Sequence, residues 1–242
     1  MQGPCQARGP GGSDSPRQRR GTLLRVSAGF PLASQFLAGS TTPARVVKRE
    51  HTPRLYGARV DAGDFLVLDV ETAGGNWSTF PAGFNLLLTG TRAAQTYGAY
   101  TAVPASLVEL ARFLSLWDGP VVTFNGAKFD LPVLDRWFTE VLAERLDVRQ
   151  HYDLAREIER QSGIRISLDR VSRYTFGEEK MAWDHRRNAR SWAEEPHRMI
   201  DYNRIDLDLT HELFMRVLRA EPLFLGEATV MLDPPGPSTF SP

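Results

Sequence analysis

The chain has 242 residues, 42% of them hydrophobic, which is enough for one folded domain with a substantial core. Its 29 basic and 29 acidic side chains balance, but residues 1–60 hold ten basic and two acidic residues, so the remainder is acidic. The single cysteine, Cys5, excludes an internal disulfide and a thiolate zinc site, and no apolar run is long enough to span a membrane. We therefore expect a cytoplasmic protein without a membrane partner.

Composition divides the chain into three parts. Residues 1–60 are rich in Gly, Pro, Ser and Arg without sustained periodicity, which predicts a basic, disordered arm. Residues 61–225 contain the periodic apolar segments of a folded domain. Residues 226–242 end in a Pro-rich run, which predicts a short disordered tail.

Short apolar segments in the first half of the domain predict four strands and one helix. Pro104 suits the first turn of that helix, and Gly119 suits its end. Between them, apolar side chains recur at helical spacing from Leu107 to Trp117. The predicted elements are strands at 65–71, 83–91 and 94–101, a helix at 104–119 and a strand at 121–124.

The second half of the domain is mostly helical. A helix is predicted at 130–145, followed by a short strand at 151–153 and by a last helix at 193–219. Strands that precede and alternate with helices favour an α/β fold, here an open mixed sheet flanked by helices.

Two carboxylates end the first predicted strand. Asp69 and Glu71 are two residues apart, so both side chains point to the same face of the sheet. An acidic pair at an exposed strand edge is the structural alternative, because Asp-x-Glu is common by chance. Two adjacent carboxylates also suit a hard divalent cation, which prefers oxygen ligands.

Two further acidic motifs follow in chain order. Asp130 comes after Asn125 at the junction of the fourth strand with a helix, where an ordinary turn and helix cap is the alternative. Tyr202 and Asp206 lie four residues apart on one face of the last helix, where a surface pair is the alternative. The order of the three motifs, on strand, strand-to-helix junction and late helix, favours one site for metal-dependent phosphodiester hydrolysis.

On these residues the chain resembles the DEDD superfamily of ribonuclease-H-like 3′-to-5′ exonucleases. The resemblance spans about residues 64–219, and its three motifs are 69–72, 125–130 and 202–206. A tyrosine four residues before the last aspartate is typical of the DEDDy branch, whereas the histidine branch would need His where this chain has Asp201. Within that branch, the segment 166–169 resembles small stand-alone predicted exonucleases.

The resemblance implies a two-metal mechanism with Mg²⁺ or Mn²⁺ as cofactors. Asp69, Glu71 and Asp206 would hold the first ion, and Asp69 would bridge to a second ion that Asp130 supports through water. Tyr202 would orient the attacking water, since a phenol with a pKa of about 10 is a poor base at neutral pH. These five residues are the expected catalytic set, and the four carboxylates are the expected metal ligands.

The resemblance also implies that the substrate is a nucleic acid with a 3′ end. Thr72 would hold the terminal sugar, and Asn125 and Phe129 would line the cleft. Phe129 is equally suited to core packing and to stacking on a base. The loop at 74–77 departs from the family pattern, and it is either part of the substrate mouth or a wide turn.

Other polar residues are left outside the predicted site. The five histidines show no spacing suited to zinc and are expected at the surface or in the core. Asp153 is interpreted as the cap of a helix that begins at Leu154. The run 180–190 mixes basic and aromatic residues, and we favour a solvated loop over a nucleic-acid clamp.

The sequence therefore predicts a metal-dependent 3′-to-5′ exonuclease that hydrolyses single-stranded nucleic acid to nucleoside monophosphates, with DNA slightly favoured over RNA. An RNA-processing nuclease is the alternative among enzymes. A catalytically silent nucleic-acid-binding module of the same fold is the alternative outside them, and an interaction domain with structural carboxylates is a third.

Overall fold

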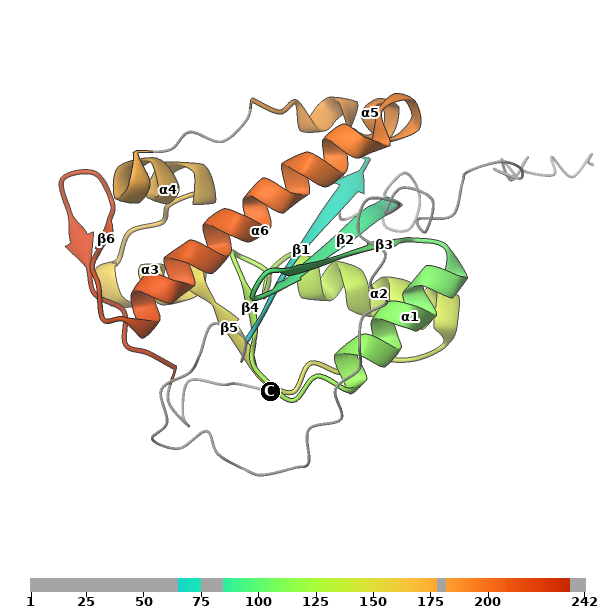
Figure 1. Cartoon of the computed structure of the whole chain (residues 1–242), viewed down its shortest axis with the longest axis horizontal. Helices are drawn as coiled ribbons and strands as arrows, with labels where there is room; N and C mark the ends of the chain where they lie inside the picture. The colour runs from blue at the N-terminus through green and yellow to red at the C-terminus, as the bar shows by residue number, and fades with distance from the viewer. Residues whose placement is uncertain (1–64, 75–84, 178–181, 236–242) are drawn as a thin grey trace, which may run out of the picture.

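The computed structural model describes residues 65–74, 85–177 and 182–235. The predicted basic arm, residues 1–60, and most of the loop at 74–77 lie outside the described residues. Five strands form one sheet with helices on both faces, which confirms the predicted α/β fold (Figure 1). No helix within the described ranges is both long and apolar enough to cross a membrane.

The sheet combines antiparallel and parallel pairing. Its strands are β1 (Leu66–Ala73), β2 (Asn85–Ala93), β3 (Thr96–Thr101), β4 (Val121–Thr123) and β5 (His151–Asp153). They lie in the order β3-β2-β1-β4-β5, with β3-β2-β1 antiparallel and β1-β4-β5 parallel. The register of β1 against β2 shifts between Glu71 and Thr72, so a β-bulge or similar irregularity falls within the first motif.

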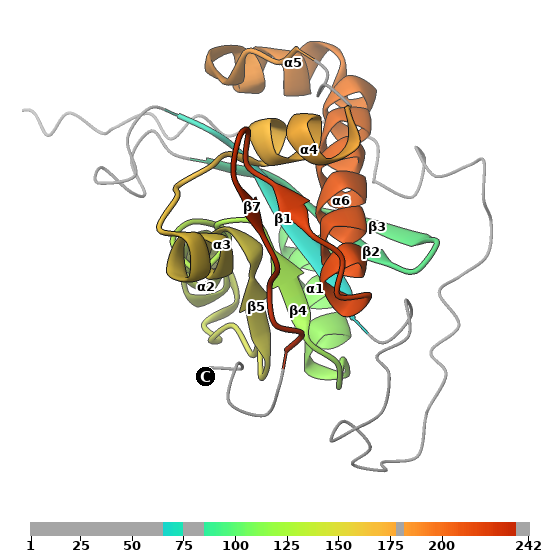
Figure 2. The same cartoon turned by 90° about the vertical axis from the view of Figure 1, so that its left-hand side faces the viewer.

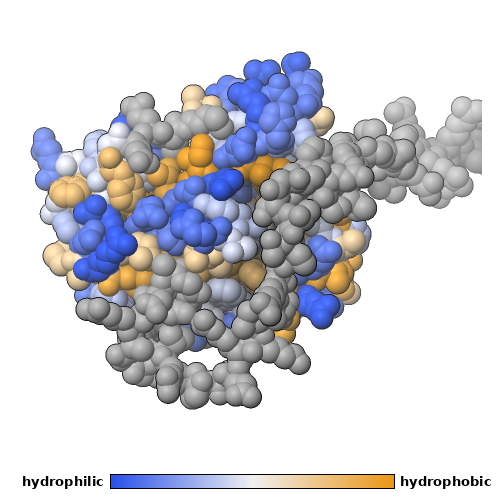
Figure 3. Space-filling model, in the orientation of Figure 1, coloured by the Kyte–Doolittle hydropathy of each residue, from blue (hydrophilic) through white to orange (hydrophobic). Residues whose placement is uncertain are grey.

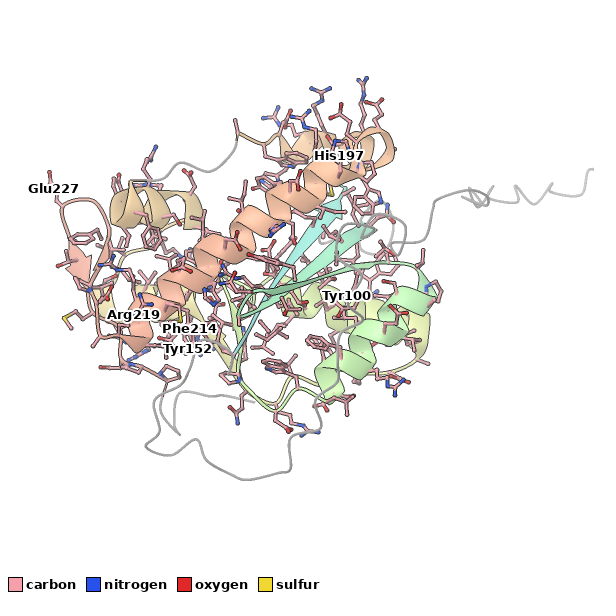
Figure 4. The ribbon with its side chains drawn as sticks, viewed as in Figure 1. Tyr100, Tyr152, His197, Phe214, Arg219 and Glu227 are labelled. Carbon is pink, nitrogen blue, oxygen red and sulfur yellow. The ribbon has the colours of Figure 1, made fainter. Side chains whose placement is uncertain are left out.

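Helices cover both faces of this sheet. They are α1 (Pro104–Ser115), α2 (Asp130–Leu142), α3 (Leu154–Ser162), α4 (Leu168–Phe176), α5 (Asn188–Glu194) and α6 (Pro196–Leu218), with a 3-10 turn η3 (His185–Arg187) before α5. The longest, α6, crosses the sheet diagonally, and its Phe214 packs on Tyr152 of β5 with ring centroids 5.1 Å apart (Figure 4).

Alternation of side chains along β1 separates two hydrophobic cores. Leu66, Leu68 and Val70 belong to the core under α1 and α2. Phe65 and Val67 belong to the opposite core, under α3, α4 and α6. The odd-numbered carboxylates of the first motif continue this second face, so β1 directs them toward α6.

Three predicted helices end or begin at different residues in the structure. Helix α1 ends at Ser115 rather than at 119, so Trp117 lies beyond the helix. Helix α2 ends at Leu142 rather than at 145. The predicted helix at 193–219 is two helices, because Pro196 lacks a backbone N–H and begins α6 as a new first turn.

The C-terminal segment corrects a predicted boundary. We expected residues 226–242 to be a disordered tail, but the described part of it, to residue 235, continues the fold (Figure 2). Strand β7 (Thr229–Val230) pairs with β6 (Leu223–Phe224), and Val230 and Leu232 are buried. Both side chains belong to the hydrophobic core under α3, α4 and α6, so the folded part of the chain extends beyond the limit that we placed at 225.

Candidate active site

Three carboxylates meet where the end of β1 faces α6. Asp69 and Glu71 come from β1, and Asp206 comes from α6, one helical turn after Tyr202. One oxygen of each carboxylate lies within 4.8 Å of the other two. Glu71 and Asp206 are buried, so their negative charges are partly removed from water and repel one another strongly.

This donor set fits a divalent metal ion. Carboxylate oxygens are hard ligands of the kind that Mg²⁺ and Mn²⁺ prefer, and a cation between them would offset their repulsion. The three carboxylates line an open cleft of about 330 Å³, so a metal ion there could also contact a substrate. The cleft is bordered by α5 and η3, and the surface over α5 is strongly hydrophilic (Figure 3).

Asp130 lines the same cleft from the first turn of α2 but is not one of the three clustered carboxylates. Its Oδ1 accepts a hydrogen bond of 2.9 Å from the backbone N–H of Val70, which ties α2 to β1. Burial is the main cause that raises the pKa of Asp130 to about 7; the nearby charges of Asp153 and Asp206 act in the same direction, and hydrogen bonds from backbone N–H groups, that of Val70 first, act against it. In the absence of metal, Asp130 therefore exchanges its proton near neutral pH.

Tyr202 forms another side of the cleft. Burial raises its pKa above the usual range, and the negative charges of Asp206, Glu71 and Asp69 act in the same direction. A hydrogen bond to Asp206 also favours the neutral phenol. Tyr202 therefore keeps its proton at any physiological pH, which suits a hydrogen-bond donor and positioning group better than a base.

Asn203 supports the carboxylate of Asp69 and was absent from the predicted site. Its Nδ2 donates a hydrogen bond of 2.7 Å to Oδ2 of Asp69. This approach of α6 to the sheet requires Gly90 on β2, because a Cβ atom at position 90 would overlap the Asn203 amide. A glycine inside an apolar strand often marks such a close approach, so Gly90 was the available sequence signal.

Asp153 holds the loop of the second motif. It caps α3, as predicted, by accepting hydrogen bonds from the N–H groups of Ala155 and Arg156. It also accepts from the N–H groups of Asn125 at 2.8 Å and Ala127 at 3.0 Å, which the sequence did not predict. Asn125 adopts a left-handed φ of 68°, and these bonds stabilise that turn before Asp130.

The predicted substrate residues Thr72, Asn125 and Phe129 all line the cleft. Asn125 is exposed, whereas Thr72 and Phe129 are half-buried. Phe129 also packs against the core under α1 and α2, so both of its predicted roles are compatible with its position.

Most described residues of the run 180–190 are exposed, as our preference for a solvated loop predicted, but the run also forms η3 and the start of α5 and contributes to the cleft. Within its described part, His185 and Asn188 line the cleft, and Trp183 stacks on Tyr202. His185 is exposed, as expected for a surface histidine, but it also lines the cleft, whereas His197 at the start of α6 is exposed outside the cleft lining (Figure 4). The mixture of aromatic and polar residues in this run was the signal for its role.

Comparison with known proteins agrees with this geometry. The sequence profile described as the RNase H superfamily matches residues 66–217, which is more than half of the chain. No curated protein sequence matches. Among solved structures, the family B DNA polymerase of the hyperthermophilic archaeon Pyrobaculum calidifontis is similar, with a TM-score of 0.53 and 16% identity. That similarity covers 64% of this chain and 24% of the polymerase chain, and it supports the fold.

Proposed function

The chain belongs to the RNase H superfamily, and we propose that it is a metal-dependent 3′-to-5′ exonuclease of the DEDDy branch. The observation that carries this proposal is the meeting of Asp69, Glu71 and Asp206 within 4.8 Å, in an open cleft that Tyr202 also lines. The superfamily supports nuclease chemistry, and the position of Tyr202 one turn before Asp206 supports the branch.

The proposed cofactors are two divalent ions, Mg²⁺ or Mn²⁺. Asp69, Glu71 and Asp206 would hold one ion, and Asp69 with Asp130 would support the other. When bound, such ions lower the pKa of water and offset negative charge on the phosphate. The chain itself supplies the geometry: Asn203 fixes Asp69 by its hydrogen bond, and the Val70 N–H fixes Asp130.

Tyr202 has a separate role in this proposal. Its protonated phenol can donate a hydrogen bond at the acidic end of the cleft, which would orient a water molecule or a phosphate oxygen for in-line attack. Replacing Tyr202 by Phe should therefore lower the rate of hydrolysis while the carboxylates continue to bind metal.

The proposed substrate is the 3′ end of a single strand, with nucleoside monophosphates as products and DNA slightly favoured over RNA. Thr72, Asn125 and Phe129 would contact the terminal nucleotides, since they line the cleft beside the carboxylates. Half-buried Phe129 offers an aromatic surface on which a base could stack without sequence preference.

The direct test uses the full chain and single-stranded DNA or RNA labelled at the 5′ end, with Mg²⁺, Mn²⁺ or chelator. We expect a ladder that shortens from the 3′ end, requires metal and is abolished by Asp206→Asn. Asp201→Asn is the matched control, because Asp201 is an exposed carboxylate on the same helix. Strand binding without cleavage by a folded, metal-bound protein would instead favour the catalytically silent module.

A further inference from the structure

The ring of Tyr202 is contacted by two aromatic side chains from the segment before α5. Trp183 stacks on it with a centroid distance of 4.8 Å and an interplanar angle of 22°. His185 meets it edge to face, at 5.8 Å and 80°. A phenol held on two sides in this way loses much of the freedom that an aromatic ring has about its second side-chain torsion.

The indole of Trp183 is in turn fixed by Asn188. Its Nε1–H donates a hydrogen bond of 2.6 Å to Oδ1 of Asn188, which is 2% exposed. Nδ2 of Asn188 donates a second hydrogen bond of 2.8 Å to the backbone carbonyl of Thr72. An indole can only donate and a carbonyl can only accept, so the two partners define one orientation of the Asn188 amide.

These contacts form a continuous path from β1 to Tyr202, and we name Trp183, His185 and Asn188 the Tyr202 bracket. The path begins at Thr72, one residue after Glu71, on the strand that carries two of the clustered carboxylates. The Tyr202 ring is therefore positioned relative to the same strand as those carboxylates, although Tyr202 itself belongs to α6.

We propose that Trp183 and Asn188 are positioning residues for Tyr202, an inference that rests on the proposed exonuclease function. Neither residue needs to touch the reacting atoms. Their role is to keep the Tyr202 hydroxyl in a fixed place relative to Asp69 and Glu71, because catalytic groups act well only within about 0.5 Å of the productive geometry.

A double-mutant cycle tests this role. Trp183→Leu removes the stacking ring and the indole donor, and Asn188→Ala removes the link to Thr72. Each is measured in the natural protein and in Tyr202→Phe, by steady-state hydrolysis at saturating metal, which gives kcat and KM separately. With Tyr202 present we expect a loss of about 10- to 100-fold in rate for each variant, and with Phe at 202 less than about 3-fold.

Several outcomes would overturn the inference. Equal losses in both backgrounds would mean that Trp183 and Asn188 act on the fold or on another part of the site. A raised KM with unchanged kcat would make Trp183 a substrate contact instead. Trp192→Phe in α5 is the matched tryptophan control and should leave the rate unchanged, and binding of Mn²⁺ should be unaltered in all variants.

A second measurement does not depend on any catalytic activity. Stacked aromatic rings in a fixed geometry contribute to near-ultraviolet circular dichroism, so Asn188→Ala should remove most of the signal that Trp183→Leu removes. In the Trp183→Leu background, Asn188→Ala should then cause little additional change. A spectrum of Asn188→Ala identical to that of the natural protein would refute the bracket. If the spectra of the variants showed the expected dependence of Trp183 on Asn188 but the natural protein did not hydrolyse nucleic acid, only the proposed exonuclease function would be refuted.

Discussion

The carboxylates on the two sides of the cleft are held by different means. On the β4–α2 side, Asp130 accepts a hydrogen bond from the backbone N–H of Val70, and Asp153, which supports this side from outside the cleft lining, accepts from four backbone N–H groups. On the β1–α6 side, Asp69, Glu71 and Asp206 face one another within 4.8 Å. The first side is stabilised by the backbone of the protein, whereas the second concentrates negative charge and gains most from a bound cation.

The sharpest test of this comparison is Asp206→Asn. We expect hydrolysis to fall by about 10³-fold or more, because the change removes a proposed metal ligand and its charge. In chelator, the free energy of unfolding should stay the same or rise, since one of three mutually repelling carboxylates becomes neutral. Thermal unfolding with and without Mg²⁺ measures the change in stability. A large loss of stability of Asp206→Asn in chelator would contradict the view that the carboxylates on the β1–α6 side repel one another.

Asp153→Ala tests the opposite side. It removes the acceptor of four backbone N–H groups, so we expect a loss of about 3 kcal/mol in the free energy of unfolding. Ser167→Ala is a matched control, because Ser167 caps α4 by accepting from a single N–H, and its loss should be about 1 kcal/mol. Urea unfolding in chelator measures both, and equal losses would show that the bonds to Asn125 and Ala127 add nothing.

The pH dependence of stability should follow Asp130. Its raised pKa means that the folded, metal-free protein holds a proton between about pH 4 and pH 7 that the unfolded chain has released. Stability in chelator should therefore fall by about 2 kcal/mol from pH 5 to pH 7, while stabilisation by Mg²⁺ should increase as that proton leaves. Asp130→Asn should remove this fall in stability between pH 5 and pH 7. Asp201→Asn is the control and should leave the fall unchanged. If stability still fell steeply with pH in Asp130→Asn, Asp130 would not be its cause.

Gly90→Ala is expected to give the smallest effect, and it reports on the support of Asp69. The added methyl group would displace Asn203, so we expect a loss of about 1 kcal/mol in stability and a weaker affinity for Mn²⁺. Isothermal titration measures the affinity. Adding Asn203→Ala should recover part of the stability but not the metal affinity, because the hydrogen bond to Asp69 remains absent.

The clustering of the acidic residues and Tyr202 in the cleft was predictable from the sequence because these residues follow the regular spacing of a strand and a helix. The two-residue period of a strand places Asp69 and Glu71 on one face, and one turn of helix places Tyr202 beside Asp206. The bracket was not predictable in this way, since Asn188 and Thr72 are 116 residues apart and meet only through the fold. The extension of the fold beyond 225 was missed because Pro234 and Pro235 dominate the composition of that segment and obscure Val230 and Leu232.

The β6–β7 pairing determines how short a useful fragment of this protein can be. Val230 and Leu232 share a core with Leu154 and Ile158 of α3, and the Tyr152 hydroxyl donates a hydrogen bond of 3.3 Å to the carbonyl of Asp233. A fragment that stops at 225 would leave that apolar surface uncovered and would be prone to aggregate during expression. A fragment for crystallisation should therefore extend at least to residue 235.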